Sequence, residues 1–142
     1  MSKIKTYKVT GTDHYLKNIM ELASENLDFD YSKKELIDAG YEDERIYKYD
    51  FYINKFELVP DPTNEYDPNA IKVLADNIHI GYIKSGSCKH LNKVIAENRI
   101  EKIDGKIGGG KYKYIGYDDD TEKYFMDKGE TSFFVDLYIS EL

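Results

Sequence analysis

Apolar and polar residues alternate with a period of two near both ends of the chain, which is the pattern of half-buried β-strands. Residues 3–12 place Tyr7, Val9 and Gly11 on one face, so we expect a strand that ends in a glycine turn there. Residues 132–140 alternate in the same way. The side chains expected to point inward from this second strand are Phe133, Val135, Leu137 and Ile139.

The middle of the chain predicts three more strands and a helix. Residues 47–59 read as one strand that Pro60 stops, because proline has no amide hydrogen for the sheet. Residues 70–74 and 79–83 are two short strands joined by a hairpin turn. A helix is expected over about 85–97, where apolar residues recur at helical spacing.

Helical signals also follow the first strand. Apolar residues over 14–25 form a helical stripe, and Thr12 or Asp13 could cap that helix. Ser32 is expected to cap a short second helix, Lys33–Ala39, which Gly40 ends. These segments predict an acidic, helical insertion at about residues 14–45.

The last third predicts further β-structure. Residues 100–107 are a weaker strand candidate, and Gly108–Gly110 is expected to form a flexible tip before a strand over 111–117. Residues 118–130 read as a polar excursion. The whole pattern predicts a single α+β domain over residues 1–142. About six strands would form a partly closed barrel or strongly curled sheet, with one helix after the central hairpin.

The 142-residue chain has a net charge of −7, but the charge is unevenly distributed. Residues 13–50 carry eleven acidic and five basic side chains, and residues 117–142 carry eight and two. Residues 66–116 instead carry five acidic and nine basic side chains. A phosphate backbone responds to the field within about 10 Å, so an anionic ligand is expected on this middle segment.

No catalytic or metal-binding motif emerges from the sequence. The single cysteine, Cys88, has no evident base partner and is expected to be a buried structural thiol. Gly108–Lys111 lacks the lysine–serine or lysine–threonine pair of a phosphate loop. Asp118–Asp120 lacks the spacing of a calcium loop, and the three histidines are scattered. We therefore predict a protein that is not an enzyme and has neither cofactor nor metal. With no signal-peptide pattern and no long apolar run, it is predicted to be cytoplasmic.

The most informative stretch is the proline-rich loop before the central hairpin, residues 58–82. Its prolines limit the loop's conformations, and its asparagines and Asp67 can bond to nearby backbone amides. Tyr66 stands among them, so the loop would display one aromatic ring beside one carboxylate, and a preorganised loop loses little entropy on binding. The alternative, in which Asp67 only holds the loop together, stays open. The residues expected to shape this region are Pro62, Pro68, Asn69 and Gly81.

The run DPTNEYDPNAIKV, followed by IGYI, resembles the central motif of the HIRAN family, and VTGTDHY is similar to that family's opening strand. HIRAN domains occur in DNA-remodelling ATPases and as stand-alone bacterial or phage proteins. The resemblance implies an OB-like barrel that binds single-stranded DNA by its 3′-hydroxyl end. A protein of this kind would act in DNA processing or repair.

Transferred by position, the resemblance assigns roles within the loop and the first strand. Tyr66 would stack on a terminal base, Asp67 would accept a hydrogen bond from the 3′-hydroxyl, and Asn64 would brace the loop and touch the ligand. The family's first strand has a basic residue followed by an aromatic, and Asp13 and His14 stand at those positions, with Tyr15 next; His14 would stack on the ligand. Asp13 departs from that pattern, because its charge repels a phosphate.

Basic side chains next to aromatics extend the predicted nucleic-acid site to Lys84, Lys111 and Lys113. We expect the last two to share one face near the binding groove and to lie away from the acidic helices. An ordinary solvated surface is the alternative for all three. A second hypothesis for the whole protein is a protein–protein adaptor that docks through its acidic insertion and has a vestigial DNA groove. The sequence leaves the oligomeric state and the choice between DNA and RNA open.

Overall fold

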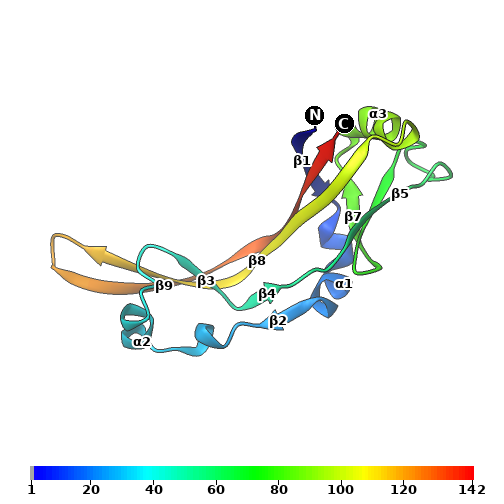
Figure 1. Cartoon of the computed structure of the whole chain (residues 1–142). Helices are drawn as coiled ribbons and strands as arrows, with labels where there is room; N and C mark the ends of the chain where they lie inside the picture. The colour runs from blue at the N-terminus through cyan, green and yellow to red at the C-terminus, as the bar shows by residue number, and fades with distance from the viewer. Residues whose placement is uncertain (1) are drawn as a thin grey trace. The chain divides into compact units, whose positions relative to one another are not determined.

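The computed structural model describes residues 2–142, and the chain forms two compact units (Figure 1). Unit 1 comprises the residues up to Leu22, Tyr52–Ile107 and Phe134–Leu142, and unit 2 comprises Ala23–Phe51 and Gly108–Phe133. The protein is 51% β and 23% helical, with a curled antiparallel sheet of seven strands. The predicted α+β class with an OB-like sheet is therefore confirmed. One domain over the whole chain stays a prediction.

Unit 1 holds most of the curled sheet. The order in the seven-stranded sheet is β3-β8-β9-β1-β7-β6-β5. The first strand, β1, pairs antiparallel with the last strand and, at its other end, with β7, where Val9 faces Ile83 and Thr10 faces Tyr82. The bounds in unit 1 are β1 Lys3–Thr10, β5 Phe56–Pro60, β6 Ile71–Ala75 and β7 Ile78–Ile83.

Three helical segments accompany this sheet: η1 Thr12–Tyr15, α1 Leu16–Glu21 and α3 Ser85–Ala96. The prediction of α3 is confirmed. The single helix expected over 14–25 is wrong, because a 3₁₀ turn starts the segment and β-structure replaces its end. The core joins the sheet to these helices. Its fully buried side chains include Ile19, Ile71, Ile80, Leu91 and Leu137.

The central hairpin has the predicted form. Asp76 and Asn77 connect β6 to β7 with φ values of 47° and 68°. Two consecutive positive φ angles define the turn whose twist matches that of paired strands, and aspartate and asparagine tolerate them best after glycine. The Asp76 carboxylate also accepts hydrogen bonds from the backbone amides of Asn54 and Lys55.

Gly81 in β7 allows β1 to approach closely. A Cβ atom at this position would lie 2.7 Å from the carbonyl oxygen of Thr10 and 2.7 Å from a methyl carbon of Val9. Any side chain here would push the two strands apart, so the sequence needs glycine to keep the pairing of Thr10 with Tyr82.

Unit 2 contains most of the predicted insertion. Ser32 caps α2, Lys33–Asp38, with a complete capping box to Glu35, and Gly40 follows with a φ of 84°. This short helix is confirmed. Leu36 packs with Ile46 and Ile115 in a small core. The other elements are β2 Ala23–Glu25, η2 Leu27–Asp30, β3 Arg45–Tyr47 and β4 Tyr49–Phe51.

The continuous strand predicted over 47–59 is wrong. Its residues divide among β3, β4 and β5, and they serve three different pairings: β3 with β8, β4 with β2, and β5 with β6. Alternating residues favour strand structure locally, but they do not reveal where a chain leaves one partner for another.

Two 19-residue strands, β8 Ile100–Asp118 and β9 Lys123–Glu141, contribute to both units. The predicted flexible tip at Gly108–Gly110 is wrong, because these glycines lie inside β8. A Cβ at Gly109 would lie 2.3 Å from the Ser132 carbonyl oxygen, and one at Gly110 would touch the Phe133 ring. The polar excursion predicted over 118–130 is wrong: residues 119–122 form the hairpin turn between the strands, and residues 123–130 belong to β9. The inward direction of Val135, Leu137 and Ile139 is confirmed.

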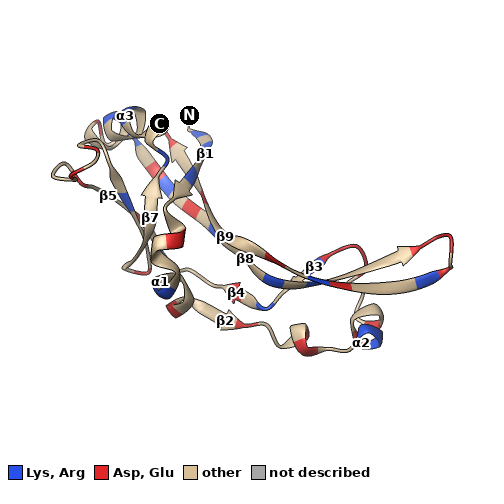
Figure 2. Ribbon diagram, turned by 180° about the vertical axis from the view of Figure 1, so that it is seen from behind, with Lys and Arg blue, Asp and Glu red and all other residues tan. Residues whose placement is uncertain are grey.

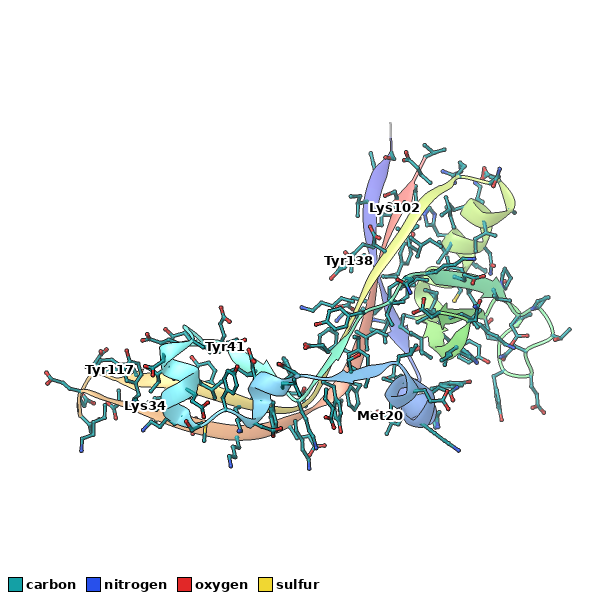
Figure 3. The ribbon with its side chains drawn as sticks, turned by 60° about the horizontal axis from the view of Figure 1, so that its bottom comes forward. Met20, Lys34, Tyr41, Lys102, Tyr117 and Tyr138 are labelled. Carbon is teal, nitrogen blue, oxygen red and sulfur yellow. The ribbon has the colours of Figure 1, made fainter. Side chains whose placement is uncertain are left out.

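The two units differ in charge. Unit 2 carries fifteen acidic and eight basic side chains, whereas unit 1 carries twelve of each. Figure 2 shows the acidic positions of unit 2 on the segments from β2 to α2 and at the turn between β8 and β9, and Figure 3 shows Lys34, Tyr41 and Tyr117 among its side chains. The whole excess of negative charge therefore belongs to unit 2.

Candidate nucleic-acid interface

A cavity of about 310 Å³ lies in unit 1 beside the proline-rich loop. The loop supplies Asn64, Tyr66 and Asp67, and the start of α3 supplies Ser85. Further lining comes from Thr10 of β1, Tyr82 of β7, Lys84 and Cys88. We call this cavity the Tyr66 pocket.

Asn64 organises the loop that forms one wall of the pocket. Its side-chain oxygen accepts hydrogen bonds from the backbone amides of Tyr66 at 2.9 Å and Asp67 at 3.0 Å. Its side-chain nitrogen donates to the Asp61 carboxylate at 3.2 Å. One asparagine thus satisfies two loop amides, and this fixes the backbone on which the ring and the carboxylate stand.

Asp67 uses one carboxylate oxygen to hold the loop. Its Oδ1 accepts a hydrogen bond from the Asn69 amide at 2.8 Å, and its backbone oxygen accepts one from Ala70 at 3.1 Å. A carboxylate has two oxygens with room for several donors. Asp67 can therefore hold the turn and still accept a hydrogen bond from a ligand in the pocket.

Tyr66 is 92% exposed, although it carries one of the largest apolar side chains in the chain. The backbone beneath it is fixed by Asn64, so the ring has a defined place without being part of the core. An exposed aromatic ring at the mouth of a cavity offers a face on which a base can stack.

Tyr82 links the pocket to a group of aromatic rings behind it. The Tyr15 ring lies 4.3 Å from the His79 ring and 6.2 Å from the Tyr82 ring, measured between centroids. Burial and then the hydrogen bond with Tyr82 raise the pKa of Tyr15, so its hydroxyl stays neutral. Burial likewise lowers the pKa of His79. Tyr15 therefore packs against the rings of His79 and Tyr82, and it is not one of the residues that line the cavity.

The start of α3 contributes polar groups to the pocket. Lys84 is exposed at the N-cap position and makes no side-chain capping bond, and the amide of Ser87 in the first turn donates to the Lys84 backbone oxygen at 2.9 Å. The side-chain nitrogen of Asn92, further along α3, donates to the backbone oxygen of Asn69 at 2.9 Å. This bond ties the end of the loop to the helix. The Cys88 thiol is 1% exposed, and burial raises its pKa, as expected for a structural cysteine.

Four of the predicted binding residues do not line the pocket: Tyr15, as described above, His14, Lys111 and Lys113. His14 is exposed on η1 and does not line it. Lys111 and Lys113 lie on the part of β8 that belongs to unit 2. Lys113 donates to the backbone oxygen of Tyr31 at 3.3 Å and lies 4.8 Å above the Phe29 ring. The expectation that it lies away from the acidic insertion is wrong, because lysine stems also pack on apolar surface.

Sequence reasoning missed Thr10, Tyr82, Ser85 and Cys88 as pocket residues. Tyr82 could have been found, because it directly follows Gly81 in the run IGYI. The other three come from segments whose approach to the loop depends on the pairing of β1 with β7 and on the packing of α3. Local sequence carries no sign of those contacts.

Comparison with protein-family models gives one decisive match, to the HIRAN domain over residues 45–107. The chain carries a HIRAN domain. The match includes the loop, the central hairpin, α3 and the start of β8, and so most of the pocket. HIRAN domains are DNA-binding modules, which supports nucleic-acid binding here. Neither the curated proteins nor the solved structures gave a match.

Two further observations concern the part of the chain that the structure describes. Across residues 2–142, no three histidine, cysteine, aspartate or glutamate side chains gather where they could hold a metal ion. Within the same residues, no helix has the length and apolar character that a membrane span requires.

Proposed function

We propose that the Tyr66 pocket binds the free 3′ end of a nucleic-acid strand, with single-stranded DNA as the ligand, in DNA processing or repair. Tyr66 stacks on the terminal base, and the second oxygen of Asp67 accepts a hydrogen bond from the 3′-hydroxyl. Lys84 and the first amides of α3 contact a phosphate. The observation that carries the proposal is the exposed, braced ring beside a carboxylate with spare acceptor capacity.

The acid in the pocket favours an end over the interior of a strand. Every phosphate that approaches Asp67 costs Coulomb energy, and this cost disfavours continuous backbone at that point. A terminal hydroxyl is neutral and can donate, and a charged acceptor forms the stronger class of hydrogen bond with it. The pocket residues hold, orient and select; no nucleophile–base pair has been identified among them, so we propose a binding module and not an enzyme.

Replacing Asp67 with asparagine tests the end recognition. The amide keeps the shape and one acceptor oxygen but removes the charge, so the preference for a 3′-hydroxyl over a 3′-phosphate should narrow by about tenfold, a difference of roughly 1.4 kcal/mol. Fluorescence polarisation with both strands and both proteins gives the two ratios. Asp104→Asn removes the same charge at an exposed position of β8, outside the pocket. It should leave the preference for a 3′-hydroxyl over a 3′-phosphate unchanged. An unchanged ratio in Asp67→Asn would rule out the end-recognition role.

A comparison of lysines tests where the strand runs. Lys84→Gln should flatten the dependence of log affinity on log salt by about 0.7, the value for one phosphate contact to a single strand. Lys111→Gln, in unit 2, removes the same charge and should change the slope less. Binding titrations at four salt concentrations measure both slopes. A larger effect from Lys111 would move the strand onto β8 and overturn the assignment of the pocket.

The charge of unit 2 supports a second candidate function, a protein–protein adaptor. An excess of seven negative charges repels a polyanion and complements a basic protein surface. In this case strand binding would be weak and insensitive to Tyr66, whereas a lysine-rich peptide would bind in a salt-dependent way. The Asp67→Asn experiment separates the two functions, because an adaptor shows no preference between strand ends.

A further inference from the structure

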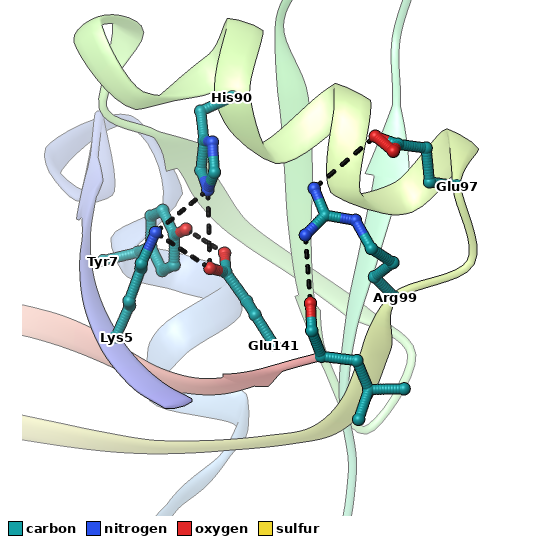
Figure 4. A network of polar contacts seen from close by, with 7 residues as sticks. Lys5, Tyr7, His90, Glu97, Arg99 and Glu141 are labelled. Atoms are coloured by element: carbon teal, nitrogen blue, oxygen red, sulfur yellow. Dashed lines mark hydrogen bonds and ion pairs between the residues drawn. The ribbon is translucent and has the colours of Figure 1, made fainter. Parts of the chain in front are cut away.

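A second polar cavity of about 240 Å³ lies in unit 1 where β1 begins. Figure 4 shows the polar contacts of Glu141 and Arg99, two of the residues that line it. Lys3 and Lys5 of β1, His90 of α3, Arg99 and Glu141 of β9 line it, together with Leu142. None of these residues lines the Tyr66 pocket. We call it the Glu141 cavity.

The buried carboxylate of Glu141 is contacted by three polar side chains, those of Lys5, Tyr7 and His90. Its side chain is 5% exposed, and its Oε2 lies 3.1 Å from the Lys5 Nζ and 3.4 Å from the His90 Nε2. The hydroxyl of Tyr7 donates to the other oxygen. Burial acts to raise the pKa of Glu141, but the hydrogen bonds from Tyr7, Lys5 and His90 outweigh it and hold the pKa below its ordinary value. The carboxylate is therefore ionised.

His90 cannot satisfy both of its neighbours at once. Its Nε2 lies 3.2 Å from the Lys5 Nζ and 3.4 Å from Glu141. An unprotonated nitrogen accepts from the lysine, whereas a protonated one donates to the carboxylate. In either state the Lys5 ammonium, which has three N–H donors, keeps at least one that His90 and Glu141 do not accept. An anion entering the cavity could accept from that donor.

Arg99 and Lys3 add positive charge that no buried carboxylate matches. Arg99 donates to the backbone oxygen of Leu142 at 3.0 Å and makes a long contact of 3.5 Å with Glu97 on the surface. Its Nε is buried and has no hydrogen-bond partner within the described chain. The Lys3 side chain is exposed on the same face of β1 as Lys5, two residues away. Three cationic side chains thus line the cavity with one side-chain carboxylate.

We propose that the Glu141 cavity is a phosphate-binding site. Its ligand is a backbone phosphate of the strand whose end the Tyr66 pocket holds, so the proposal rests on the proposed function. Thr10 at the Tyr66 pocket and Lys5 at the Glu141 cavity lie five residue steps apart along β1, roughly 17 Å of extended chain. A strand of several nucleotides can span that distance, and single strands occupy about 4–16 nucleotides on an OB-type sheet.

The double variant Lys3→Gln/Arg99→Gln tests the site by strand length. With a strand of about twelve nucleotides, we expect a five- to tenfold loss of affinity at low salt and a salt slope flatter by about 0.7. With a strand of about three nucleotides, which fills only the Tyr66 pocket, the loss should be less than twofold. Equal losses on both lengths, or no loss on either, would overturn the proposal.

Lys102→Gln/Lys106→Gln is the matched control. It removes two positive charges from exposed positions of the same unit that line neither cavity. Affinity for both strand lengths should stay within twofold of wild type. A loss as large as that of Lys3→Gln/Arg99→Gln would mean that total charge, and not the cavity, sets the effect. Lys3→Gln alone, at an exposed position, repeats the test if loss of Arg99 weakens folding.

A measurement without nucleic acid separates the site from the proposed function. Inorganic phosphate at saturating concentration should raise the melting temperature of wild type by about 2–5 °C over chloride of equal ionic strength. The double variant should lose this rise, and the control variant should keep it. If no strand binds but the rise persists, the proposed function fails while phosphate binding at the cavity stands. If the rise is absent in wild type, the cavity does not bind phosphate.

Discussion

Tyr66→Ala is expected to weaken single-strand binding by about 1–3 kcal/mol, because stacking of a base on an aromatic ring contributes that much. The free energy of unfolding should change by less than about 0.5 kcal/mol, since the ring is 92% exposed and surface changes have small effects. Fluorescence polarisation and thermal melting on the same preparation measure the two quantities.

Tyr66→Phe is the informative companion to that variant. It keeps the aromatic face and removes only the hydroxyl, so binding should stay within about threefold of wild type if the ring itself carries the interaction. A large loss in Tyr66→Phe would assign the effect to a hydrogen bond from the hydroxyl. A sharply lowered melting temperature in Tyr66→Ala would show that Tyr66 is a packing residue.

Gly81→Ala is expected to destabilise the protein by about 1–3 kcal/mol, the usual cost of overpacking a tight contact. The added carbon would lie 2.7 Å from the Thr10 carbonyl oxygen and from Val9, so β1 must move away from β7. Because Thr10 and Tyr82 line the Tyr66 pocket, strand binding should weaken as well. Urea unfolding measures the first effect and polarisation the second.

Gly86→Ala is the control for this substitution. Gly86 lies in α3, and a Cβ there would meet no atom within 4 Å. Alanine also favours the helix over glycine, so stability should rise slightly or stay the same. Equal destabilisation by both variants would contradict the role of close strand approach at Gly81.

Elements with a local signal could be predicted from the sequence. Ser32 with Glu35 marks the start of α2, and Asp76-Asn77 marks the hairpin, because each feature is formed by residues next to one another. Gly108–Gly110 was misjudged for the opposite reason. Three glycines in a row favour a flexible loop locally, but Ser132 and Phe133, more than twenty residues away, need their small size within a strand.

The candidate site divides in the same way. Asn64, Tyr66 and Asp67 belong to one short run and could be singled out together, and the structure places all three at one cavity. Lys111 and Lys113 have a suitable composition but lie in unit 2. Composition reports which side chains can contact a phosphate, whereas their position depends on the path of β8, which no neighbouring residue determines.

The uneven charge of the two units has a consequence for the rate of encounter with a ligand. A polyanionic strand is repelled by the fifteen acidic side chains of unit 2 at distances where it makes no contact at all. Unit 1 exerts no such net repulsion, whatever the arrangement of the two units. Collisions that reach the protein are therefore enriched on unit 1, and misdirected complexes on unit 2 are short-lived. If the proposed function holds, the acidic unit reduces the surface that a strand must search before it reaches the Tyr66 pocket.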